Sequence, residues 1–456
     1  RELGALITKE TSQNKAVAHA VYAFYFMAGS LLIWTLVCIF NLLRTGFNVG
    51  QNVWLSRWAN PAHSKQFSKG VYMGAYIAMV MGEVIFILAY VLIMIKFTIN
   101  ASRNIHRRLL NSIAHATTAF FDKTPLGRLL SRFSKDISLI DTMLSLQLQQ
   151  ATNLAFLVLG VVVNMAVASK YAIIIVLFAL LYFVVMLLLY RRTSIQLQRL
   201  EALSRAPIFT HFGETLEGLP TVRAYGMVHN FTIAIMNKVD YNAVDFLTLR
   251  RLTQWFNMAT NQVVAIIVMG VFLMLILFRN YSPQSYDVAL AVSACANSVT
   301  LVTILGAFAF LFSEFEARMN APEHVLEYNN VEQEKAYEIE ATKPDPEWPK
   351  NGKIEFDQLT IAYKPGVPVL HGLTATIKPR EKVGIVGRTG AGKSTLITAL
   401  FRTTEPVSGS VKIDGVDIDT LGLYDLRRRL SIIPQVPQLF MGTVRYNLDP
   451  FGYHTD

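Results

Sequence analysis

The residues with the clearest chemistry form one glycine-rich stretch. It consists of Gly387, Arg388, Thr389, Gly390, Ala391, Gly392, Lys393, Ser394 and Thr395. Its spacing matches the phosphate-loop pattern, in which glycines let backbone N–H groups close around phosphates. In this pattern Lys393 brings positive charge to the β and γ phosphates, and Ser394 binds Mg²⁺. The sequence therefore predicts a site for a nucleotide together with its magnesium ion.

The segments on either side of this stretch are those that a phosphate loop requires. A short buried strand is expected over 382–387 and a helix over 394–400. The phosphates then lie at a helix N-terminus, where the helix dipole favours negative charge. A chance glycine-rich turn lacks this context, so we prefer the phosphate-binding interpretation.

The surrounding sequence has the pattern of an α/β domain. Residues 353–363 read as a strand, and 409–418 read as a hairpin that turns at Asp414 and Gly415. The preceding stretch, 329–352, is acidic, contains several prolines and has no apolar period. We interpret it as a linker that precedes a new domain.

The rest of the chain is too apolar for a soluble domain. Of its 456 residues, 52% are hydrophobic and 16% are charged, whereas about a quarter are charged in soluble domains. This composition excludes a disordered chain and argues against a single compact soluble domain.

Six apolar runs are each long enough to cross a bilayer, which takes about 20 helical residues. They lie at 17–43, 71–95, 146–168, 171–190, 258–278 and 288–312. A buried helix in a soluble core is an alternative for the last run, which is more polar, but a poor one for 171–190, which is apolar all round. We therefore predict a polytopic α-helical membrane domain with six spanning helices, followed by a partial α/β nucleotide-binding domain.

The basic residues predict which ends of the helices face the cytoplasm. Lys and Arg number seven in 97–145 and eight in 191–257, but four in 44–70. By the positive-inside rule, these two long connections and both termini are cytoplasmic. Each connection lacks Gly and Pro except at short breaks, so we expect two helical hairpins that extend beyond the membrane. The breaks suit short helices at the tips that contact a cytoplasmic partner, and a plain helical hairpin turn is the alternative.

These patterns divide the chain into four parts. We expect a cytoplasmic lead-in at 1–16, the membrane domain at 17–328, the linker at 329–352 and the partial nucleotide-binding domain at 353–456. The net charge of +10 is concentrated in the hairpins, where it satisfies the topology rule and gives no support for nucleic-acid binding. Both cysteines lie inside apolar runs, which argues against a disulfide framework or a cysteine-built metal site.

Three segments resemble the C subfamily of ATP-binding-cassette exporters, which includes the multidrug-resistance-associated proteins. Residues 120–141 (FFDKTPLGRLLSRFSKDISLID) and 207–226 (PIFTHFGETLEGLPTVRAYG) resemble its two cytoplasmic loop signatures. Residues 432–451 (IIPQVPQLFMGTVRYNLDPF) resemble its segment around the Q-loop. The resemblance covers nearly the whole chain. It implies the second membrane domain and the N-terminal part of the second nucleotide-binding domain of a two-half transporter.

The resemblance also implies a function and further site residues. Such a transporter exports organic solutes, among them organic anions and conjugates, and uses ATP with Mg²⁺. Tyr363 matches the aromatic residue that stacks on adenine. Gln435 matches the Q-loop residue that senses Mg²⁺ and the γ-phosphate. The tip of the second hairpin, for which 206–214 is our candidate, then contacts the opposite nucleotide-binding domain.

The implied partners are the missing first half of the transporter, in cis or in trans, a small-molecule substrate and the lipid bilayer. No nucleic acid is implied. The implied location is a multi-pass integral protein of the plasma membrane or of a vacuole- or lysosome-like membrane.

Several motifs of the family do not occur between Gln435 and Asp456. The signature loop, the Asp-Glu of Walker B and the switch histidine are missing there, so no catalytic residue is assigned to this segment. Phosphoryl transfer depends on charges placed around the phosphate. We therefore expect the segment alone to bind nucleotide without hydrolysing it.

The start of the fifth apolar run departs from the pattern typical of the drug-exporting members. The first Arg of that pattern is kept as Arg250, but Arg251, Trp255 and Asn257 replace its Trp, Arg and Glu. Glutathione-conjugate specificity is therefore not carried over to this chain.

Two other functions stay open at this point. The same subfamily contains an ATP-gated anion channel and a regulatory subunit of potassium channels. The lack of a long phosphorylatable insert argues mildly against the channel. The other alternative is a truncated product that binds nucleotide without transport, because the sequence stops at Asp456, ahead of the catalytic motifs.

Polar residues in the apolar runs are candidates for the substrate path, because such residues face the protein interior or a wet cavity. Glu83 lies in the middle of the second run, where it either lines the path or forms a structural pairing. Ser293, Asn297 and Thr300 recur at helical spacing in the sixth run, so they share a face. That face either lines a translocation cavity or joins helices through close packing and hydrogen bonds.

Overall fold

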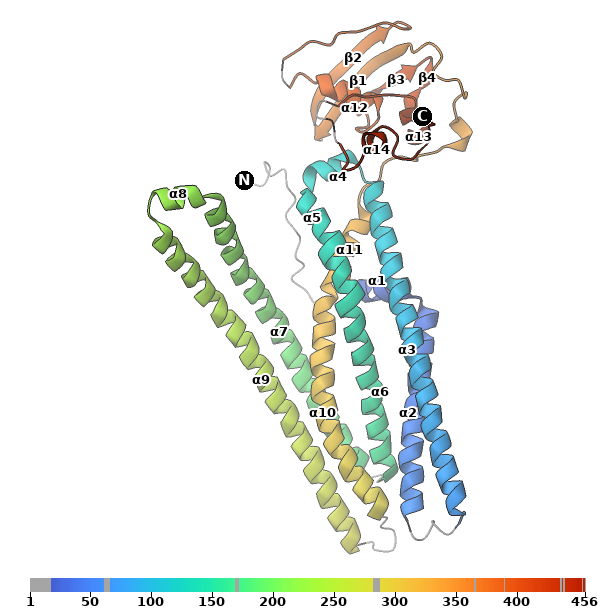
Figure 1. Ribbon diagram of the computed structural model, residues 1–456, viewed down its shortest axis with the longest axis vertical. Helices are drawn as coiled ribbons and strands as arrows, with labels where there is room; N and C mark the ends of the chain where they lie inside the picture. Colours follow the sequence, from blue (N-terminus) through green and yellow to red (C-terminus); the bar gives the residue numbers. More distant parts are fainter. Residues whose placement is uncertain are drawn as a thin grey trace. The chain divides into compact units, whose positions relative to one another are not determined.

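The computed structural model describes residues 18–60, 66–168, 172–281, 288–364, 366–388, 390–434, 437, 439–452 and 454–455. These residues form two compact units (Figure 1). The membrane unit contains the described residues up to Leu110 and Leu129–Asn329. The nucleotide unit contains Asn111–Arg128 and Asn330 onward. The tip of the first hairpin, Asn111–Arg128, therefore belongs to the same unit as the predicted nucleotide-binding domain.

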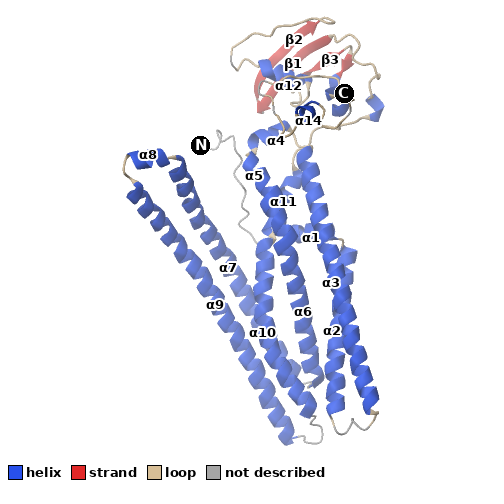
Figure 2. Cartoon of the chain, in the orientation of Figure 1, coloured by secondary structure: helices blue, strands red, loops and turns tan. Residues whose placement is uncertain are grey.

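Helices make up the membrane unit (Figure 2). The α-helices are α1 His19–Gly29, α2 Leu31–Ala59, α3 Lys69–Ala114, α6 Ser145–Ala168, α7 Ala172–Glu217, α8 Leu219–Ala224, α9 Val228–Tyr281, α10 Val288–Arg318 and α11 Asn320–Glu327. Two π-helical segments, η2 Arg132–Asp136 and η3 Leu139–Leu144, precede α6, and a 3₁₀ turn, η5 Tyr328–Asn330, follows α11.

Within the described residues, six helices are long and apolar enough to cross a membrane. This confirms the predicted polytopic helical domain. Helices α3, α7 and α9 have 46, 46 and 54 residues, whereas about 20 suffice to span the hydrocarbon core. The expected continuation of these helices well beyond the span is therefore confirmed.

The predicted bounds of the first span are wrong. One helix was expected over 17–43, but the chain breaks at Ser30, where φ is 81°, and α2 begins after it. Gly29 lies so close to α3 that a Cβ would come within 2.3 Å of the Phe97 ring. The break is thus set by packing against α3, which an apolar composition does not reveal.

The predicted position of the second hairpin's tip is also wrong. The tip was expected at 206–214, but α7 continues through Pro207 and the chain reverses at α8. Proline usually kinks or ends a helix because it lacks an N–H donor. Here the Asn242 amide of α9 donates to the Glu201 carbonyl at 3.0 Å and to Ser204 Oγ at 2.9 Å. Contact with α9 therefore holds α7 in place just before the proline.

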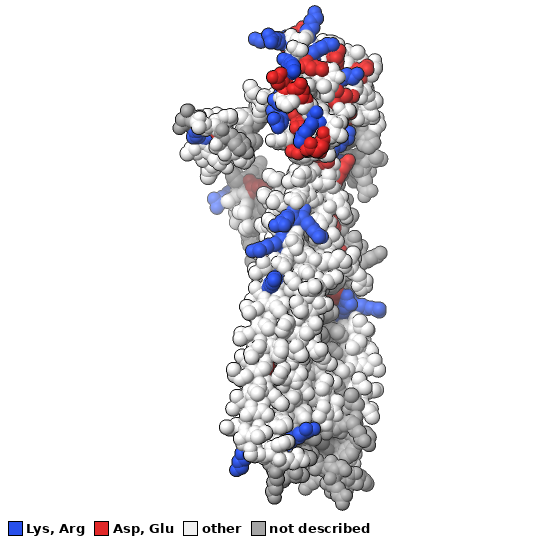
Figure 3. All heavy atoms as spheres, turned by 90° about the vertical axis from the view of Figure 1, so that its right-hand side faces the viewer, with Lys and Arg blue, Asp and Glu red and all other residues white. Residues whose placement is uncertain are grey.

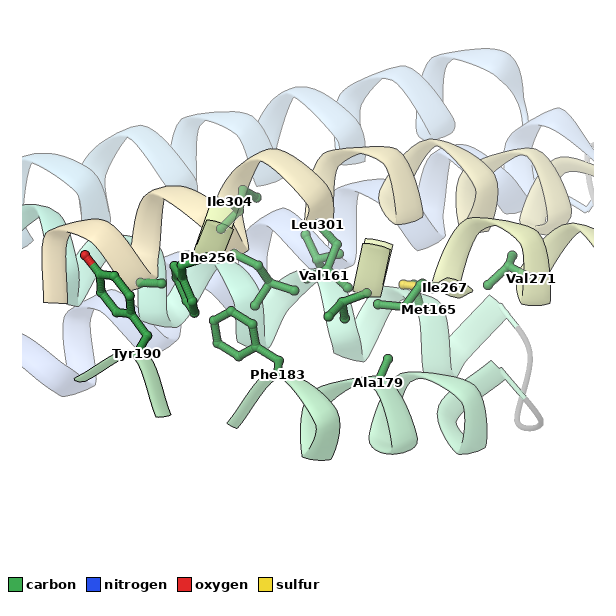
Figure 4. Packing of buried hydrophobic residues seen from close by; sticks show 13 residues of the cluster. Val161, Met165, Ala179, Phe183, Tyr190, Phe256, Ile267, Val271, Leu301 and Ile304 are labelled. Atoms are coloured by element: carbon green, nitrogen blue, oxygen red, sulfur yellow. The ribbon is translucent and has the colours of Figure 1, made fainter. Parts of the chain in front are cut away.

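Side chains from α6, α7, α9 and α10 form a buried core in the membrane unit (Figure 4). They are Val161, Met165, Ala179, Phe183, Tyr190, Phe256, Val263, Ile267, Val271, Leu301, Ile304, Leu305 and Ala309. The Tyr190 and Phe256 rings stack with centroids 4.3 Å apart. Many other apolar side chains of these helices are exposed, as lipid-facing residues are. The face of the spanning helices visible in Figure 3 carries few charged side chains.

A four-stranded antiparallel sheet lies at the centre of the nucleotide unit. Its strands, in spatial order, are β2 Val367–Ile377, β1 Ile354–Lys364, β3 Ser408–Ile413 and β4 Val416–Asp417. The other elements are α4 Thr118–Lys123, the start of α5 Leu126–Ser131, α12 Lys393–Leu400, α13 Leu423–Arg427, α14 Val444–Leu448, η6 Glu340–Thr342 and η7 Ile418–Thr420. Buried Phe356 and Ile361 of β1 form a core with Ala399 of α12 and Leu426 of α13. The sheet therefore fixes the position of α12.

The predicted hairpin turn at Asp414 and Gly415 is confirmed. Both residues have positive φ, 48° and 80°, as two-residue hairpin turns require. The Asp414 carboxylate accepts backbone N–H groups of Asn351, Gly352 and Lys353 at 2.8–3.1 Å. Desolvation by itself raises the pKa of Asp414, but these backbone donors outweigh it and hold that pKa below its usual value.

The expected buried strand before the glycine-rich loop is not formed. Residues 382–387 form neither strand nor helix, and Val386 is 94% exposed. A strand is defined by hydrogen bonds to its neighbours, and no described segment pairs with this one. Its apolar sequence is that of a strand buried on both faces, so its burial depends on pairing with other segments.

Candidate nucleotide site

The glycine-rich loop leads directly into α12, which lies close to β2. Gly392 is the N-cap of α12 and has a φ of 85°. A Cβ at this position would lie 2.9 Å from Leu370 Cδ2 and 3.4 Å from Val369 Cγ1. Gly390 has a φ of 84°. Glycine is therefore favoured by the backbone at both positions, and at Gly392 also by the approach of β2.

The Lys393 side chain folds back over the loop. Its Nζ donates hydrogen bonds to the carbonyls of Gly387 at 2.7 Å and Arg388 at 2.8 Å. These bonds use two of the three donors of the ammonium group and hold its charge beside the N-terminus of α12. Ser394, the predicted Mg²⁺ ligand, is exposed in the first turn of that helix. The arrangement suits a phosphate group, which is stabilised by positive charge and by a helix N-terminus.

The structure brings Tyr363 of β1 to the same helix. Its Oη donates a hydrogen bond to Thr395 Oγ1 at 3.3 Å and lies 3.3 Å from Thr398 Oγ1. Tyr363 is 45% exposed, so it is not a core residue, and its ring is accessible beside the loop. Thr395 is buried and supports this tyrosine from within the helix. Thr398 was not identified from the sequence, because one threonine three residues after the motif has no signal of its own.

Two predicted residues, Thr389 and Gln435, lie outside the described residues. The described part of the chain contains no group of three or more His, Cys, Asp or Glu side chains that could hold a metal ion. Mg²⁺ commonly keeps several waters and binds through one or two protein ligands plus substrate phosphates. An exposed hydroxyl such as that of Ser394 fits this kind of site.

Comparison with known families decides the identity of the chain. Residues 34–308, more than half of the sequence, match the family described as the ABC transporter transmembrane region. Residues 370–454 match the family described as ABC transporter. The chain belongs to the ABC transporter family. It is a multi-pass integral membrane protein with a nucleotide-binding domain of the ABC transporter type.

Relatives of the C subfamily match this ABC transporter chain almost end to end. ABC transporter C family member 12 of Dictyostelium discoideum is 35% identical over 461 residues, which are 98% of this chain and 34% of that protein. ATP-binding cassette sub-family C member 3 of Mus musculus is 35% identical over 460 residues, 100% of this chain and 30% of that protein.

A fungal relative is also similar. The pleiotropic ABC efflux transporter of multiple drugs of Candida glabrata is 39% identical over 365 residues, 79% of this chain and 22% of that protein. The resemblance to the C subfamily is thus confirmed. The chain spans about a third of the length of the first two relatives.

In this ABC transporter, Glu83 is held by a neighbouring helix. Its carboxylate accepts hydrogen bonds from Asn48 Nδ2 at 3.2 Å and from Gln51 Nε2 at 2.7 Å, both on α2. Gln51 also donates to the Met79 carbonyl at 3.3 Å. These amides supply the donors that a carboxylate needs inside an apolar bundle. The contacts favour a structural pairing between α2 and α3.

The other candidates for the substrate path lie on α10. Asn297 Nδ2 donates to Ser293 Oγ at 3.3 Å, which agrees with their predicted common face. Thr300 is exposed and bonds to the Ala296 carbonyl of its own helix at 3.0 Å. The described hydrogen bonds of Glu83 go to α2 and not to these residues, so the structure does not bring the four candidates into one site.

Arg402, at the C-terminal end of α12, was missed by the sequence analysis. It is 2% exposed, and its Nη1 donates to the carbonyls of Ile418 and Leu421, each at 2.8 Å. Its Nη2 lies 3.0 Å from Glu405 Oε1. This arginine anchors the end of the helix that begins at the phosphate loop. No motif marks it, because its partners come from a different part of the chain.

Proposed function

We propose that this chain forms one membrane domain and the front part of one nucleotide-binding domain of an ATP-driven exporter of organic solutes. The observation that carries the proposal is the loop at the start of α12, with Lys393 held over it, in the same chain as six membrane-spanning helices. A phosphate loop alone occurs in many soluble enzymes. Its combination with a helical membrane domain favours transport driven by ATP. Organic anions and conjugates are the substrate class to test first.

The nucleotide site has a role for each predicted residue. The phosphates accept hydrogen bonds from the loop and from Lys393, which holds its charge in place through Gly387 and Arg388. Ser394 holds Mg²⁺ together with the phosphates, and Gln435 completes that site. The ring of Tyr363, positioned by Thr395 and Thr398, stacks on the adenine.

The proposal requires a second half, because two nucleotide-binding domains act together in this family. We propose that the first half, in cis or in trans, supplies the signature loop that clamps the γ-phosphate bound by this chain. The size of the native protein tests this point. An antibody against 353–456 should detect a band far above 51.1 kDa in source membranes if the two halves are one polypeptide. A band at 51.1 kDa would support the alternative, a product that binds nucleotide without transport, unless a separate first half co-purifies with it.

Hydrolysis is proposed to need catalytic groups that this segment does not contain. The sequence contains no Walker B Glu and no switch histidine. The purified chain should bind a photoactivatable ATP analogue but release phosphate no faster than its Lys393→Ala variant. A clear excess of phosphate release over that variant would contradict this part of the proposal.

Uptake into inside-out vesicles tests the export function. Vesicles from plasma membrane and from vacuolar or lysosomal membrane contain the complete protein with its cytoplasmic face outward, and a labelled organic anion is added outside them. ATP should drive uptake in one of these membranes, and Lys393→Ala should lower it at least about tenfold, as expected for loss of a central phosphate contact. Lys412→Ala is the matched control, because Lys412 is exposed on β3 and lies outside the loop. An ATP-dependent ion current without uptake would instead support the gated-channel alternative.

A further inference from the structure

The stretch predicted as a plain linker makes ordered contacts within the nucleotide unit. We call residues 331–337 the strap. Its backbone pairs in antiparallel register with the tip of the first hairpin. The Thr117 N–H donates to the Glu332 carbonyl at 3.1 Å, and the Glu334 N–H donates to the His115 carbonyl at 2.8 Å. The first half of the strap is therefore fixed to the hairpin tip.

The second half of the strap is fixed to α13. The Leu423 N–H donates to the Ala336 carbonyl at 3.1 Å, and the Tyr424 N–H donates to the Tyr337 carbonyl at 2.8 Å. A Cβ at Gly422 would lie 2.5 Å from the Tyr337 carbonyl oxygen. This close backbone approach leaves the strap little freedom to move relative to α13.

One side chain joins the strap to the phosphate-loop helix. Arg427 forms a bidentate pair with Glu334, through Nη1–Oε2 at 2.8 Å and Nη2–Oε1 at 2.7 Å. The same guanidinium donates to the Phe401 carbonyl at 3.0 Å and to the Arg402 carbonyl at 3.1 Å. Both carbonyls lie at the C-terminal end of α12. The hydrogen bonds that Arg427 donates to Glu334 raise the pKa of Arg427, although burial by itself lowers it.

These contacts form a continuous path in one unit. The phosphate loop leads into α12, and Arg427 binds the C-terminal end of that helix. Arg427 also pairs with the strap, which in turn pairs with the tip of the first hairpin. We propose that Arg427 is a positioning residue and that the strap transmits the position of the phosphate-loop helix to the first hairpin. This inference rests on the proposed function, because it takes ATP as the ligand of the loop. A bidentate Arg–carboxylate pair suits this role because its geometry is fixed by two parallel hydrogen bonds.

A purely structural role predicts a different result from a coupling role. If the strap only held the unit together, loss of the pair would lower stability and leave any response to nucleotide unchanged. If the strap couples the two elements, loss of the pair would remove the response of the hairpin tip to nucleotide. ATP binding itself would change little, because Arg427 contacts α12 at the end opposite to the loop.

Cross-linking across the strap measures that response directly. Gln333 Nε2 lies 3.5 Å from Ser112 Oγ, so the side chains at these two positions meet, and Ser112→Cys with Gln333→Cys tests their approach. The complete protein in native membranes is treated with a mild oxidant, with and without a non-hydrolysable ATP analogue and Mg²⁺. The rate of disulfide formation is expected to change at least about fivefold with the analogue, the lower end of typical allosteric coupling.

The variants decide between the two roles. Arg427→Gln is expected to abolish the nucleotide dependence of cross-linking, while photolabelling by the ATP analogue keeps its apparent Kd within about twofold. Arg427→Lys should keep part of the response. The reversed pair Glu334→Arg with Arg427→Glu tests the interaction without deleting its charges. It should also keep part of the nucleotide response of cross-linking. Arg429→Gln is the matched control, since Arg429 contacts the Pro346 carbonyl and not Glu334, and it should respond like the parent.

Two results would overturn the coupling role while ATP binding stands: an unchanged nucleotide response in Arg427→Gln, or a parent that is photolabelled but shows no response. A parent that is not photolabelled would overturn the proposed function, and the inference with it. Photolabelling thus separates the two failures.

Discussion

The two long hairpins end in different ways. The tip of the first hairpin lies in the nucleotide unit, where its backbone is paired with the strap. The tip of the second hairpin closes on itself through α8, with the Gly218 N–H donating to the Glu214 carbonyl at 2.9 Å and the Met227 N–H to the Val222 carbonyl at 3.0 Å. One tip is therefore tied to a distant part of its own chain, and the other is completed locally.

The exposed side chains of the second hairpin sharpen this difference. Phe209, Phe212 and Tyr225 are 67%, 52% and 79% exposed. Large apolar side chains gathered on a surface mark an interaction site more often than chance. The first hairpin is thus joined to the nucleotide unit through a segment that is distant in the sequence, whereas the exposed side chains of the second hairpin leave it open to a separate partner. We propose that this partner is the opposite nucleotide-binding domain, as the resemblance to the C subfamily implies.

The largest expected effect is at the exposed aromatic residues near the C-terminal end of α7, close to the second tip. Phe209→Asp combined with Phe212→Asp should lower ATP-driven uptake at least about tenfold, since aromatic residues at the centre of an interface carry much of its binding energy. Photolabelling by an ATP analogue should stay unchanged because the phosphate loop is untouched. Tyr241→Asp, an exposed residue further along α9, serves as the control. Uptake at the parental level in the double variant would remove these exposed aromatic residues of α7 from the coupling scheme.

The next effect is at the first tip. Thr117 is the N-cap of α4 with a φ of −65°, which proline adopts readily. Thr117→Pro therefore deletes the N–H that bonds to Glu332 with little other change. We expect the nucleotide dependence of the strap cross-link to fall about fivefold, whereas Thr117→Ala, which keeps the N–H, should behave like the parent. Equal responses in the two variants would show that this backbone bond does not transmit motion.

A smaller effect is expected on the stability of the second hairpin. Asn242→Ala removes the donor to Glu201 and Ser204 beside Pro207. The loss should lower the free energy of unfolding by about 1 kcal/mol, the usual net contribution of one hydrogen bond. Hydrogen bonds between membrane helices contribute less on average. Thermal unfolding followed by tryptophan fluorescence in detergent measures it. Asn242→Asp keeps an acceptor but loses the donor, so it should be at least as unstable; full stability would argue that α7 tolerates Pro207 without help from α9.

The smallest effect is expected for an exposed contact of the strap. Gln333→Ala deletes the side-chain bonds to Ser112 but keeps the backbone pairing. ATP-driven uptake should change by less than about twofold, since exposed polar contacts contribute little. Glu334→Gln, which weakens the half-buried pair with Arg427, should reduce uptake more. If Gln333→Ala lowered uptake more than Glu334→Gln, the side chain of Gln333 and not the ion pair would connect the strap to the hairpin.

Much of the architecture could be predicted because it follows from local patterns. The six apolar runs, the phosphate loop and the turn at Asp414 and Gly415 each depend on residues that are close in the sequence. Hydrophobic length and turn conformation are properties of such short segments. The predictions failed where a distant segment decides the outcome. The break at Ser30 depends on Phe97, and the continuity of α7 through Pro207 depends on Asn242.

The nucleotide site shows the same division. The order of residues from Gly387 to Thr395 determines a loop that can bind phosphate, because the glycines, the lysine and the helix start are adjacent in the chain. Only the tertiary structure decides that Tyr363 lies against α12 and that Arg427 joins the end of this helix to Glu334. These partners are separated by dozens of residues and are brought together by strand pairing and burial, which no local pattern records.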